Sequence, residues 1–288
     1  MDLSTNGLVL DPEAPIDLQL HTTYSDGVWK PEQLLDHLAN EQFGLAAMTD
    51  HDRVDIIPAI QQLAIERHLP LLAAAEMTAE WQGQMTDVLC FGVDPQKPEL
   101  YKLAQDVIHR QVENTREVYE NLFKKGYKFS KDGSELEAIL AKPSSQQLRE
   151  LVELVKRHSF GKGETASAGR IVLSSGGAFA TNKIADVVES AHASGAVCLI
   201  AHPGRSDGFV TYDIKTLDEL RKKVPIDGLE VYYPVHTSEQ SAMFLEYTER
   251  HQLLICAGSD SHGSDKPPIK YPAKLCRALL ERMGVQVK

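Results

Sequence analysis

Residues 16–26 (IDLQLHTTYSD) and residues 45–52 (LAAMTDHD) each begin as a short apolar run and end in histidine and acidic side chains. Five further apolar runs of strand length follow, at residues 71–76, 87–93, 197–201, 228–232 and 253–259. Helical patterns separate most of these runs, which is typical of parallel strands joined by crossover helices. The sequence therefore predicts an α/β fold, an incomplete (β/α)7 TIM-like barrel with seven parallel strands.

A helical segment interrupts this alternation between the fourth and fifth runs. Residues 98–125 and 144–158 carry apolar side chains near helical spacing. Residues 161–180 are rich in Gly, Ser, Ala and Thr, which favours a mobile loop that returns to the barrel. We expect a barrel of residues 1–97 and 170–288 with a mainly helical insertion at 98–169, although two separate domains fit the length equally well.

The composition limits the partners of the chain. It has 41 acidic and 30 basic side chains and a formal net charge of -11, so a long nucleic-acid backbone would be repelled. It contains no apolar stretch of membrane-spanning length and no secretory pattern at residue 1. The four cysteines show no CxxC spacing and are expected to be buried free thiols. We expect a cytoplasmic protein with a small anionic ligand, no long nucleic acid and no membrane; the oligomeric state has no signal in the sequence.

Polar side chains gather where the predicted strands end. They are His21 after the first strand, Asp50 and His51 after the second, Glu76 at the end of the third, His202 after the fifth, and Asp260 and His262 after the seventh. The carboxyl ends of parallel strands share one face, and imidazole nitrogen with carboxylate oxygen binds divalent cations. Singly, His202 or Glu76 would more often be a hydrogen-bonded core residue, but the agreement of several positions favours a metal site. The remaining helical histidines are assigned to solvent or to packing: His37, His68, His109, His158 and His192.

These segments resemble the polymerase and histidinol phosphatase (PHP) superfamily, and within it the stand-alone metal-dependent phosphoesterases that act on nucleotides or RNA ends. DLQLHTTYSDG at 17–27 looks like the first motif, and TDHD at 49–52 looks like the second. Glu76 matches the bridging glutamate of the family. AHPGR at 201–205 and GSDSHG at 258–263 look like the later motifs, and GLEVY at 228–232 with His236 resembles the segment between them. The resemblance spans residues 16–95 and 183–265.

The resemblance implies two or three divalent metal ions. It assigns one ion to His21, Glu76 and Asp260, a second to Glu76 and His202, and a third to Asp26, His51 and His262. Two further ligand positions depart from the family pattern, because Gln19 and Asp87 stand where it has histidines. Oxygen donors there favour manganese, with magnesium, iron and zinc as the other candidates. The Arg-Pro-His signature of the family insertion is replaced by Lys142-Pro143-Ser144.

The predicted activity is hydrolysis of a phosphoester by water that the bound cations activate. The resemblance implies a small nucleotide such as a nucleoside 3',5'-bisphosphate, or the 5'-end of a short RNA, as substrate. Arg205 is predicted to bind phosphate oxygens in a fork, the alternative being a surface ion pair. The predicted catalytic residues are Glu76, His202, Arg205 and His236, and the predicted substrate contacts are Arg205, His236, Lys142 and Arg170.

A competing hypothesis is a degenerate PHP module that binds metal or nucleotide without turnover, in a regulatory or partner-binding role. Gln19, Asp87 and Ser144 favour it because each departs from the family pattern.

Overall fold

The computed structural model describes residues 4–130 and 133–288. The chain divides into two compact units, Met1–Ala104 with Thr181–Lys288, and Gln105–Ala180. The strands given below all belong to the first unit, and their order and direction determine where the polar residues meet.

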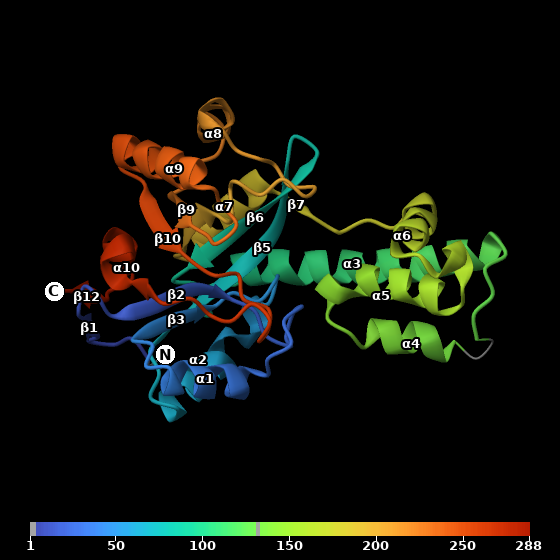
Figure 1. Ribbon diagram of the computed structural model, residues 1–288, viewed down its shortest axis with the longest axis horizontal. Helices are drawn as coiled ribbons and strands as arrows, with labels where there is room; N and C mark the ends of the chain where they lie inside the picture. The colour runs from blue at the N-terminus through green and yellow to red at the C-terminus, as the bar shows by residue number, and fades with distance from the viewer. Residues whose placement is uncertain (1–3, 131–132) are drawn as a thin grey trace. The chain divides into compact units, whose positions relative to one another are not determined.

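A four-stranded sheet in the first unit has the order β11-β2-β3-β4. Its strands are β2 (Pro15–Leu20), β3 (Leu45–Met48), β4 (Leu71–Leu72) and the antiparallel β11 (Tyr271–Pro272). Helices α1 (Pro31–Asn40) and α2 (Ile57–Glu66) make the crossovers and lie on the same side of β2 and β3 (Figure 1). The apolar face of α1, with Leu34, Leu35 and Leu38, is fully buried against them.

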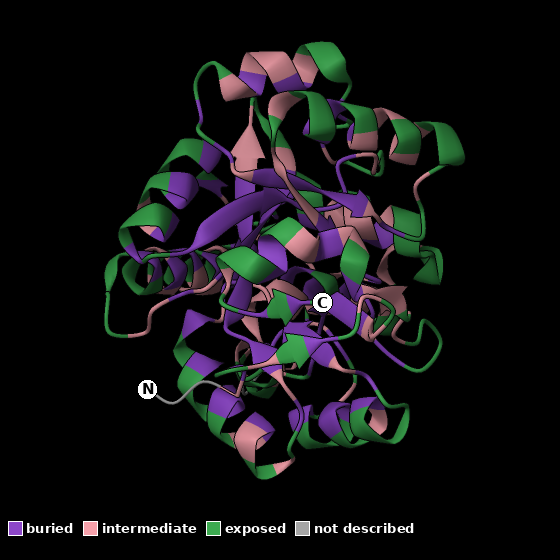
Figure 2. Cartoon of the chain, turned by 90° about the vertical axis from the view of Figure 1, so that its left-hand side faces the viewer, coloured by how far each residue is buried: buried purple, intermediate pink, exposed green. Residues whose placement is uncertain are grey.

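A six-stranded sheet has the order β10-β9-β8-β6-β5-β7. Its strands are β5 (Ala74–Trp81), β6 (Gln84–Phe91), β7 (Asn182–Lys183), β8 (Val197–Ile200), β9 (Gly228–Tyr232) and β10 (Leu254–Ala257). Its helices are α7 (Ile184–Ala193), α8 (Ile214–Arg221) and α9 (Ser238–His251), followed later by α10 (Arg277–Arg282). Near the chain ends, β1 (Val9–Leu10) pairs with β12 (Gln286–Val287). Strands β5, β6, β8 and β9 are mostly buried, while the helices alternate buried and exposed positions (Figure 2).

The prediction that all seven strands are parallel is wrong at the fourth. Strand β6 is antiparallel to both β5 and β8. Gln82 and Gly83 both have positive φ angles, 53° and 78°, and they form a tight turn that sends the chain straight back. Because β6 runs in reverse, Asp87 near its start pairs with Thr78 on β5 and lies at the edge where the parallel strands end.

The predicted run at 71–76 is also divided, between β4 and the start of β5. The two sheets meet through isolated bridges, Leu20 with Ser261 and His51 with Glu76. Strand pairing among the described residues thus gives an α/β fold of separate sheets, and it does not confirm the continuous TIM-like barrel that we expected.

The second unit is helical. It contains most of α3 (Glu99–Lys124), and α4 (Ser134–Leu140), α5 (Ser144–Arg157) and α6 (Thr165–Ser174). The helices predicted at 98–125 and 144–158 agree with α3 and α5. The mobile loop predicted at 161–180 is wrong, because α6 occupies much of it and buries Ala168 and Val172 in the core of this unit. In the described part of the chain, no helix is long and apolar enough to cross a membrane.

Candidate metal centre

The loop after β2 is held in place by one buried carboxylate. Asp50 accepts hydrogen bonds from the backbone N–H and hydroxyl of Thr22, both at 2.8 Å, and from the N–H and hydroxyl of Ser25 at 3.1 and 2.7 Å. Four bonds to one side chain order the loop that carries His21 at its start and Asp26 at its end. Asp50 is therefore a positioning residue, in keeping with the resemblance, which assigned His51 but not Asp50 to a metal ion.

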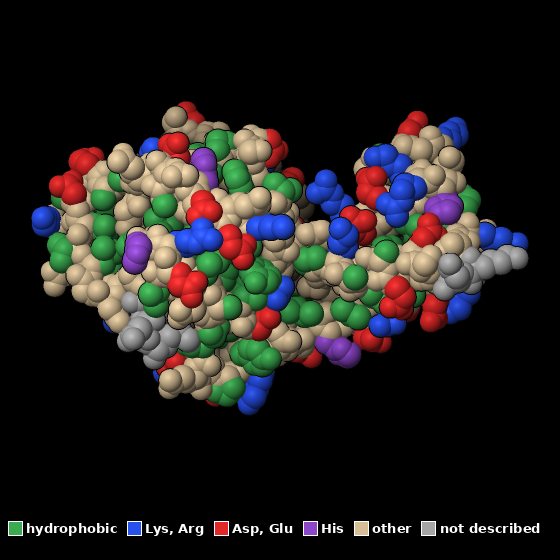
Figure 3. Space-filling view, turned by 90° about the horizontal axis from the view of Figure 1, so that it is seen from below, with side chains coloured by type: hydrophobic (Ala, Val, Ile, Leu, Met, Phe, Trp, Pro, Cys, Tyr) green, Lys and Arg blue, Asp and Glu red, His purple; other side chains and the backbone are tan. Residues whose placement is uncertain are grey.

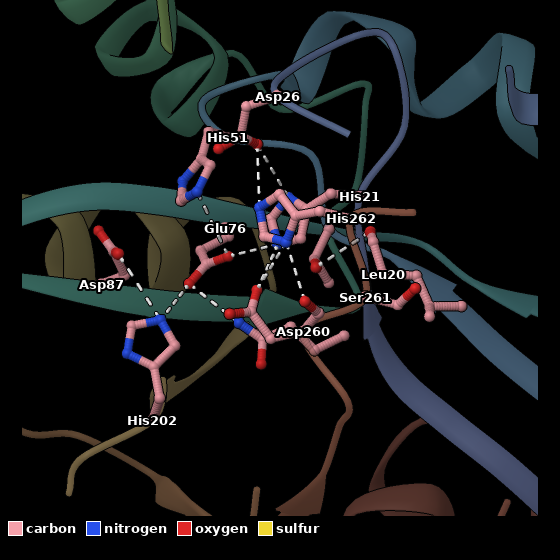
Figure 4. Close-up of polar contacts among 12 residues, drawn as sticks. Leu20, His21, Asp26, His51, Glu76, Asp87, His202, Asp260, Ser261 and His262 are labelled. Atoms are coloured by element: carbon pink, nitrogen blue, oxygen red, sulfur yellow. Dashed lines mark hydrogen bonds and ion pairs between the residues drawn. The ribbon is translucent and has the colours of Figure 1, made fainter. Parts of the chain in front are cut away.

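Glu76 lies at the centre of the polar cluster (Figure 4). Its Oε2 is 3.0 Å from Nε2 of His21 and 3.9 Å from Nε2 of His51, and its Oε1 is 3.2 Å from Nε2 of His202. The amide Nε2 of Gln19 donates to the same Oε1 at 3.1 Å. One fully buried carboxylate thus faces three imidazoles from three different strand ends, the arrangement expected of a bridging ligand.

His21 connects Glu76 to the rest of the cluster. Its Nε2 is 3.2 Å from Oδ1 of Asp260, and its Nδ1 is 3.7 Å from Oδ1 of Asp26. The ring of His21 stacks between those of His51 and His262, with centroid distances of 4.8 and 4.3 Å. Nε2 of His262 in turn lies 3.3 Å from Oδ1 of Asp26. Carboxylates and imidazoles therefore alternate through the cluster.

Three groups of side chains bring their ligand atoms within 4.8 Å of one another in this cluster. They are His21, Asp26, His51 and His262; His21, Glu76 and Asp260; and His51, Glu76 and Asp87. The second group is a ligand set that the resemblance implied, and the first is another such set with His21 added. His202, which we expected beside Glu76, lies 3.2 Å from Oε1 of Glu76 and 3.7 Å from Oδ2 of Asp87, although the third group holds His51 in its place. The metal role of all these residues stays a prediction.

The buried charges of the cluster depend on one another. Burial alone would raise the pKa of Glu76, but the neighbouring imidazoles of His51, His202 and His21 hold it well below its usual range. Asp87 shows the opposite behaviour, because burial and the charge of Glu76 raise its pKa well above the usual range. A cation beside Asp87 would favour its ionised form.

Several buried atoms of the cluster make no hydrogen bond among the described residues. They are Oε1 of Gln19, Nε2 of His21, Nδ1 of His51, Oε2 of Glu76 and Oδ1 of Asp87. A buried polar atom without a partner is unfavourable by about 1–3 kcal/mol, and coordination of a cation would satisfy it. These nitrogen and oxygen atoms are also the donors that divalent cations take. The residues therefore fit a metal centre.

The rim residues His236 and Arg205 are both engaged with the protein itself. The Nδ1–H of His236 donates to the carbonyl of Val231 at 3.1 Å, and its Nε2 accepts from the N–H of Gly204 at 3.0 Å. Burial lowers the pKa of His236 to about 4, so the ring is neutral at neutral pH. Arg205 forms the ion pair that we considered as the alternative, with Nε and Nη2 on Asp207 at 2.5 and 2.9 Å. Their substrate roles stay predictions.

Lys142 and Arg170 belong to the second unit. Lys142 lies just after α4, and Arg170 lies within α6. Their assignment to the substrate stays a prediction.

Sequence reasoning missed two buried acids below the cluster. Asp17 on β2 accepts from the N–H groups of Ser259 and Ile269 at 3.0 and 2.9 Å, and burial raises its pKa to about 7. Glu230 on β9 accepts from the N–H of His202 at 2.7 Å. Both acids could have been identified because each lies within an apolar strand. A buried carboxyl group at such a position needs a specific hydrogen-bond partner.

Three residues beside the cluster have left-handed backbone conformations. The φ angles are 56° for Asp52, 31° for His202 and 53° for Asp260. Non-glycine residues rarely adopt this region, and such strain concentrates at functional sites.

Comparison with known proteins finds relatives that are named as phosphatases and ribonucleases, whereas no protein-family model matches the chain. A 5'-3' exoribonuclease of Haemophilus influenzae is 26% identical over 250 residues, covering 85% of this chain and 89% of the relative. A 3',5'-nucleoside bisphosphate phosphatase of Chromobacterium violaceum is 25% identical over 283 residues, covering 90% and 95%. A solved structure of a proposed metal-dependent phosphoesterase from Bifidobacterium adolescentis has the same fold, with a TM-score of 0.74 at 22% identity over 95% of this chain and 98% of that chain.

Proposed function

We propose that this chain, a member of the polymerase and histidinol phosphatase superfamily, is a metal-dependent phosphoesterase that hydrolyses a small nucleotide or the end of an RNA strand. The observation that carries the proposal is the buried Glu76, which faces His21, His51 and His202 within 3.9 Å. The exoribonuclease and the nucleoside bisphosphate phosphatase among the relatives support this substrate class.

The cluster residues would hold two or three divalent cations. A bound cation supplies Lewis acidity and lowers the pKa of water, which suits attack on phosphorus. His21 and Asp260 orient one side of Glu76, and His202 and Asp87 face the other side (Figure 4). The hydrogen bonds that Asp50 makes to the loop carrying His21 and Asp26, and that Gln19 makes to Glu76, restrict how far these ligands can move.

Arg205 is the cation best placed to bind the substrate phosphate. Asp207 fixes its guanidinium, which also lies over the ring of Phe209 with its carbon 4.2 Å from the centroid. Among the described residues, its Nη1 has no hydrogen-bond partner, and 29% of the side chain is exposed. A guanidinium that is already fixed loses less conformational entropy when a ligand binds. It therefore suits recognition of a phosphate oxygen.

A small substrate suits the charge distribution of the surface. Lys and Arg side chains are scattered among Asp and Glu on the face seen in Figure 3. A formal net charge of -11, with both signs mixed on this face, gives little attraction for the backbone of a long nucleic acid. We therefore favour a nucleoside 3',5'-bisphosphate or a short RNA 5'-end.

The activity can be tested directly on purified protein. The protein is chelated, reconstituted with manganese, and offered a nucleoside 3',5'-bisphosphate, a short 5'-phosphorylated RNA and a non-nucleotide phosphate monoester. Metal-dependent phosphate or nucleotide release from a nucleotide substrate supports the proposal. Binding of these ligands without any turnover, under each metal, would favour the degenerate module instead.

We expect manganese to support the highest activity, because Asp87 places a carboxylate where the family pattern has a nitrogen donor. Its Oδ1 has no hydrogen-bond partner among the described residues, whereas Gln19 already donates to Glu76. Asp87→Ala should therefore lower kcat/KM by at least about 10-fold, and Gln19→His should change it less. The measurement is activity after reconstitution with manganese, magnesium, iron or zinc. Highest activity with zinc, together with an unchanged Asp87→Ala variant, would contradict the expectation.

Arg205→Ala should raise KM for the accepted phosphoester by about 10- to 100-fold, which is the scale of one charge-assisted hydrogen bond. Arg67→Ala is the matched control, because Arg67 is also paired with an aspartate, Asp36, on an exposed helix surface. Steady-state kinetics of both variants and of the wild type give the comparison. If KM and kcat were unchanged for Arg205→Ala, its phosphate role would be wrong.

A further inference from the structure

A second group of metal-ligand side chains lies at the opposite ends of the strands from the metal centre. His192 is in the last turn of α7, Cys198 is the second residue of β8, and Asp227 comes directly before β9. The metal centre uses His202, four residues after Cys198, and four residues of extended chain span roughly 13 Å. The two groups are therefore separate.

The three side chains are already brought together. Oδ2 of Asp227 is 2.7 Å from Nε2 of His192 and accepts the backbone N–H of Cys198 at 2.7 Å. A ring nitrogen, a sulfur and a carboxylate oxygen of this group lie within 4.8 Å of one another. The helix end and the two strands hold these residues, so no loop has to move to assemble the group.

Cys90 provides a further sulfur. It lies on β6 directly opposite Cys198 in the antiparallel pair, and both side chains point into the same core cluster. The group itself holds one sulfur, one imidazole nitrogen and one carboxylate, and Cys90 would supply a second sulfur from the neighbouring strand.

We propose that Cys90, His192, Cys198 and Asp227 bind one zinc-like divalent cation in a tetrahedral site. Cysteine sulfur, histidine nitrogen and aspartate oxygen are all ligands that zinc takes, usually four at a time. The metal centre, by contrast, offers only nitrogen and oxygen, which suits harder cations. His192 and Asp227 are 35% and 30% exposed, so an ion can enter from solvent even though both cysteines are buried. The role predicted from the sequence for His192, solvent or packing, would be replaced by a ligand role.

The ion would tie together elements that are distant in sequence. It would link β6, α7, β8 and the start of β9, and so would stabilise the folded chain by binding it and not the unfolded chain.

Cobalt(II) is the probe that separates this site from the metal centre. Thiolate ligands give cobalt a charge-transfer absorption in the near ultraviolet, and the metal centre contains no cysteine among its residues. Full-length protein is chelated under reducing conditions and titrated with cobalt. We expect the thiolate band in the wild type, its loss in Cys198→Ser, and its retention in Asp260→Asn, which alters the metal centre alone.

Exposed variants keep the test valid if Cys198→Ser fails to fold. His192→Ala should weaken the cobalt affinity measured through the band by at least about 10-fold, and Asp227→Asn should do the same while still accepting the Cys198 N–H. His109→Ala, an exposed histidine on α3, is the matched control and should leave the band unchanged. Zinc content should fall by one ion per chain in the site variants. Cobalt binding to the wild type without the band, or a band that persists in His192→Ala and Asp227→Asn, would overturn the proposal whether or not the protein hydrolyses phosphoesters.

Discussion

Glu76→Gln is expected to lower kcat/KM by about 100- to 1,000-fold, the scale seen when a central electrostatic contact of an active site is removed. The amide has nearly the same shape as the carboxylate, but it carries no charge and has one oxygen. The imidazoles of His21, His51 and His202 would then lose the anion that they share. The same substitution should reduce the number of manganese ions bound per chain.

Glu80→Gln is the matched control for this prediction. Glu80 lies on the same strand, β5. It accepts a hydrogen bond from the hydroxyl of Thr181, outside the metal centre. Activity and metal content should remain close to those of the wild type. If Glu76→Gln retained both, Glu76 would not be the bridging ligand, and the proposed centre would have to be rebuilt around other residues.

His21→Asn is expected to destabilise the metal-free protein by about 3 kcal/mol, which is the scale for removing one partner of a buried ion pair. His21 is fully buried and faces the carboxylates of Glu76 and Asp260 at 3.0 and 3.2 Å. Burial lowers its pKa, but these two neighbouring carboxylates outweigh burial and raise it well above 6.5. Without the imidazolium, both carboxylates remain buried but lose the positive charge that stabilised them.

The destabilisation caused by His21→Asn should depend on pH. Because the pKa of His21 is raised on folding, its contribution is fully present below 6.5 and is lost as the pH rises through the raised folded-state pKa. The difference in unfolding free energy between wild type and His21→Asn should therefore shrink at alkaline pH. Urea unfolding in the presence of a chelator measures it, with His109→Asn as the exposed control. A difference that is absent at every pH would show that His21 is not charged in the metal-free fold.

The convergence of the cluster was predictable because its residues follow apolar runs directly. His21, His51 and His202 come after strands whose ends share an edge, so position along the chain was enough to bring them together. The direction of β6 was not predictable from its apolar pattern, since alternation of side chains is the same in parallel and antiparallel strands. Only the short Gln82-Gly83 turn carried that information.

The other features that the sequence did not predict depend on contacts between residues far apart in the chain. Asp17 accepts a hydrogen bond from the N–H of Ser259, which lies 242 residues away in the chain. No local sequence pattern predicts such a pair. The Gly- and Ser-rich composition of 161–180 did not predict a helix, because α6 is stabilised by the packing of Ala168 and Val172 in the helical core and not by local propensity.

The burial of every cysteine has a practical consequence for spectroscopy. Cys90, Cys198, Cys256 and Cys276 all lie in the described part of the chain, and all are buried. A cysteine introduced at Gln84, an exposed residue at the tip of the β5–β6 hairpin, would react with a maleimide dye far faster than the native thiols in the folded protein. The dye would report on the hairpin that carries Glu76 and Asp87 without touching either carboxylate.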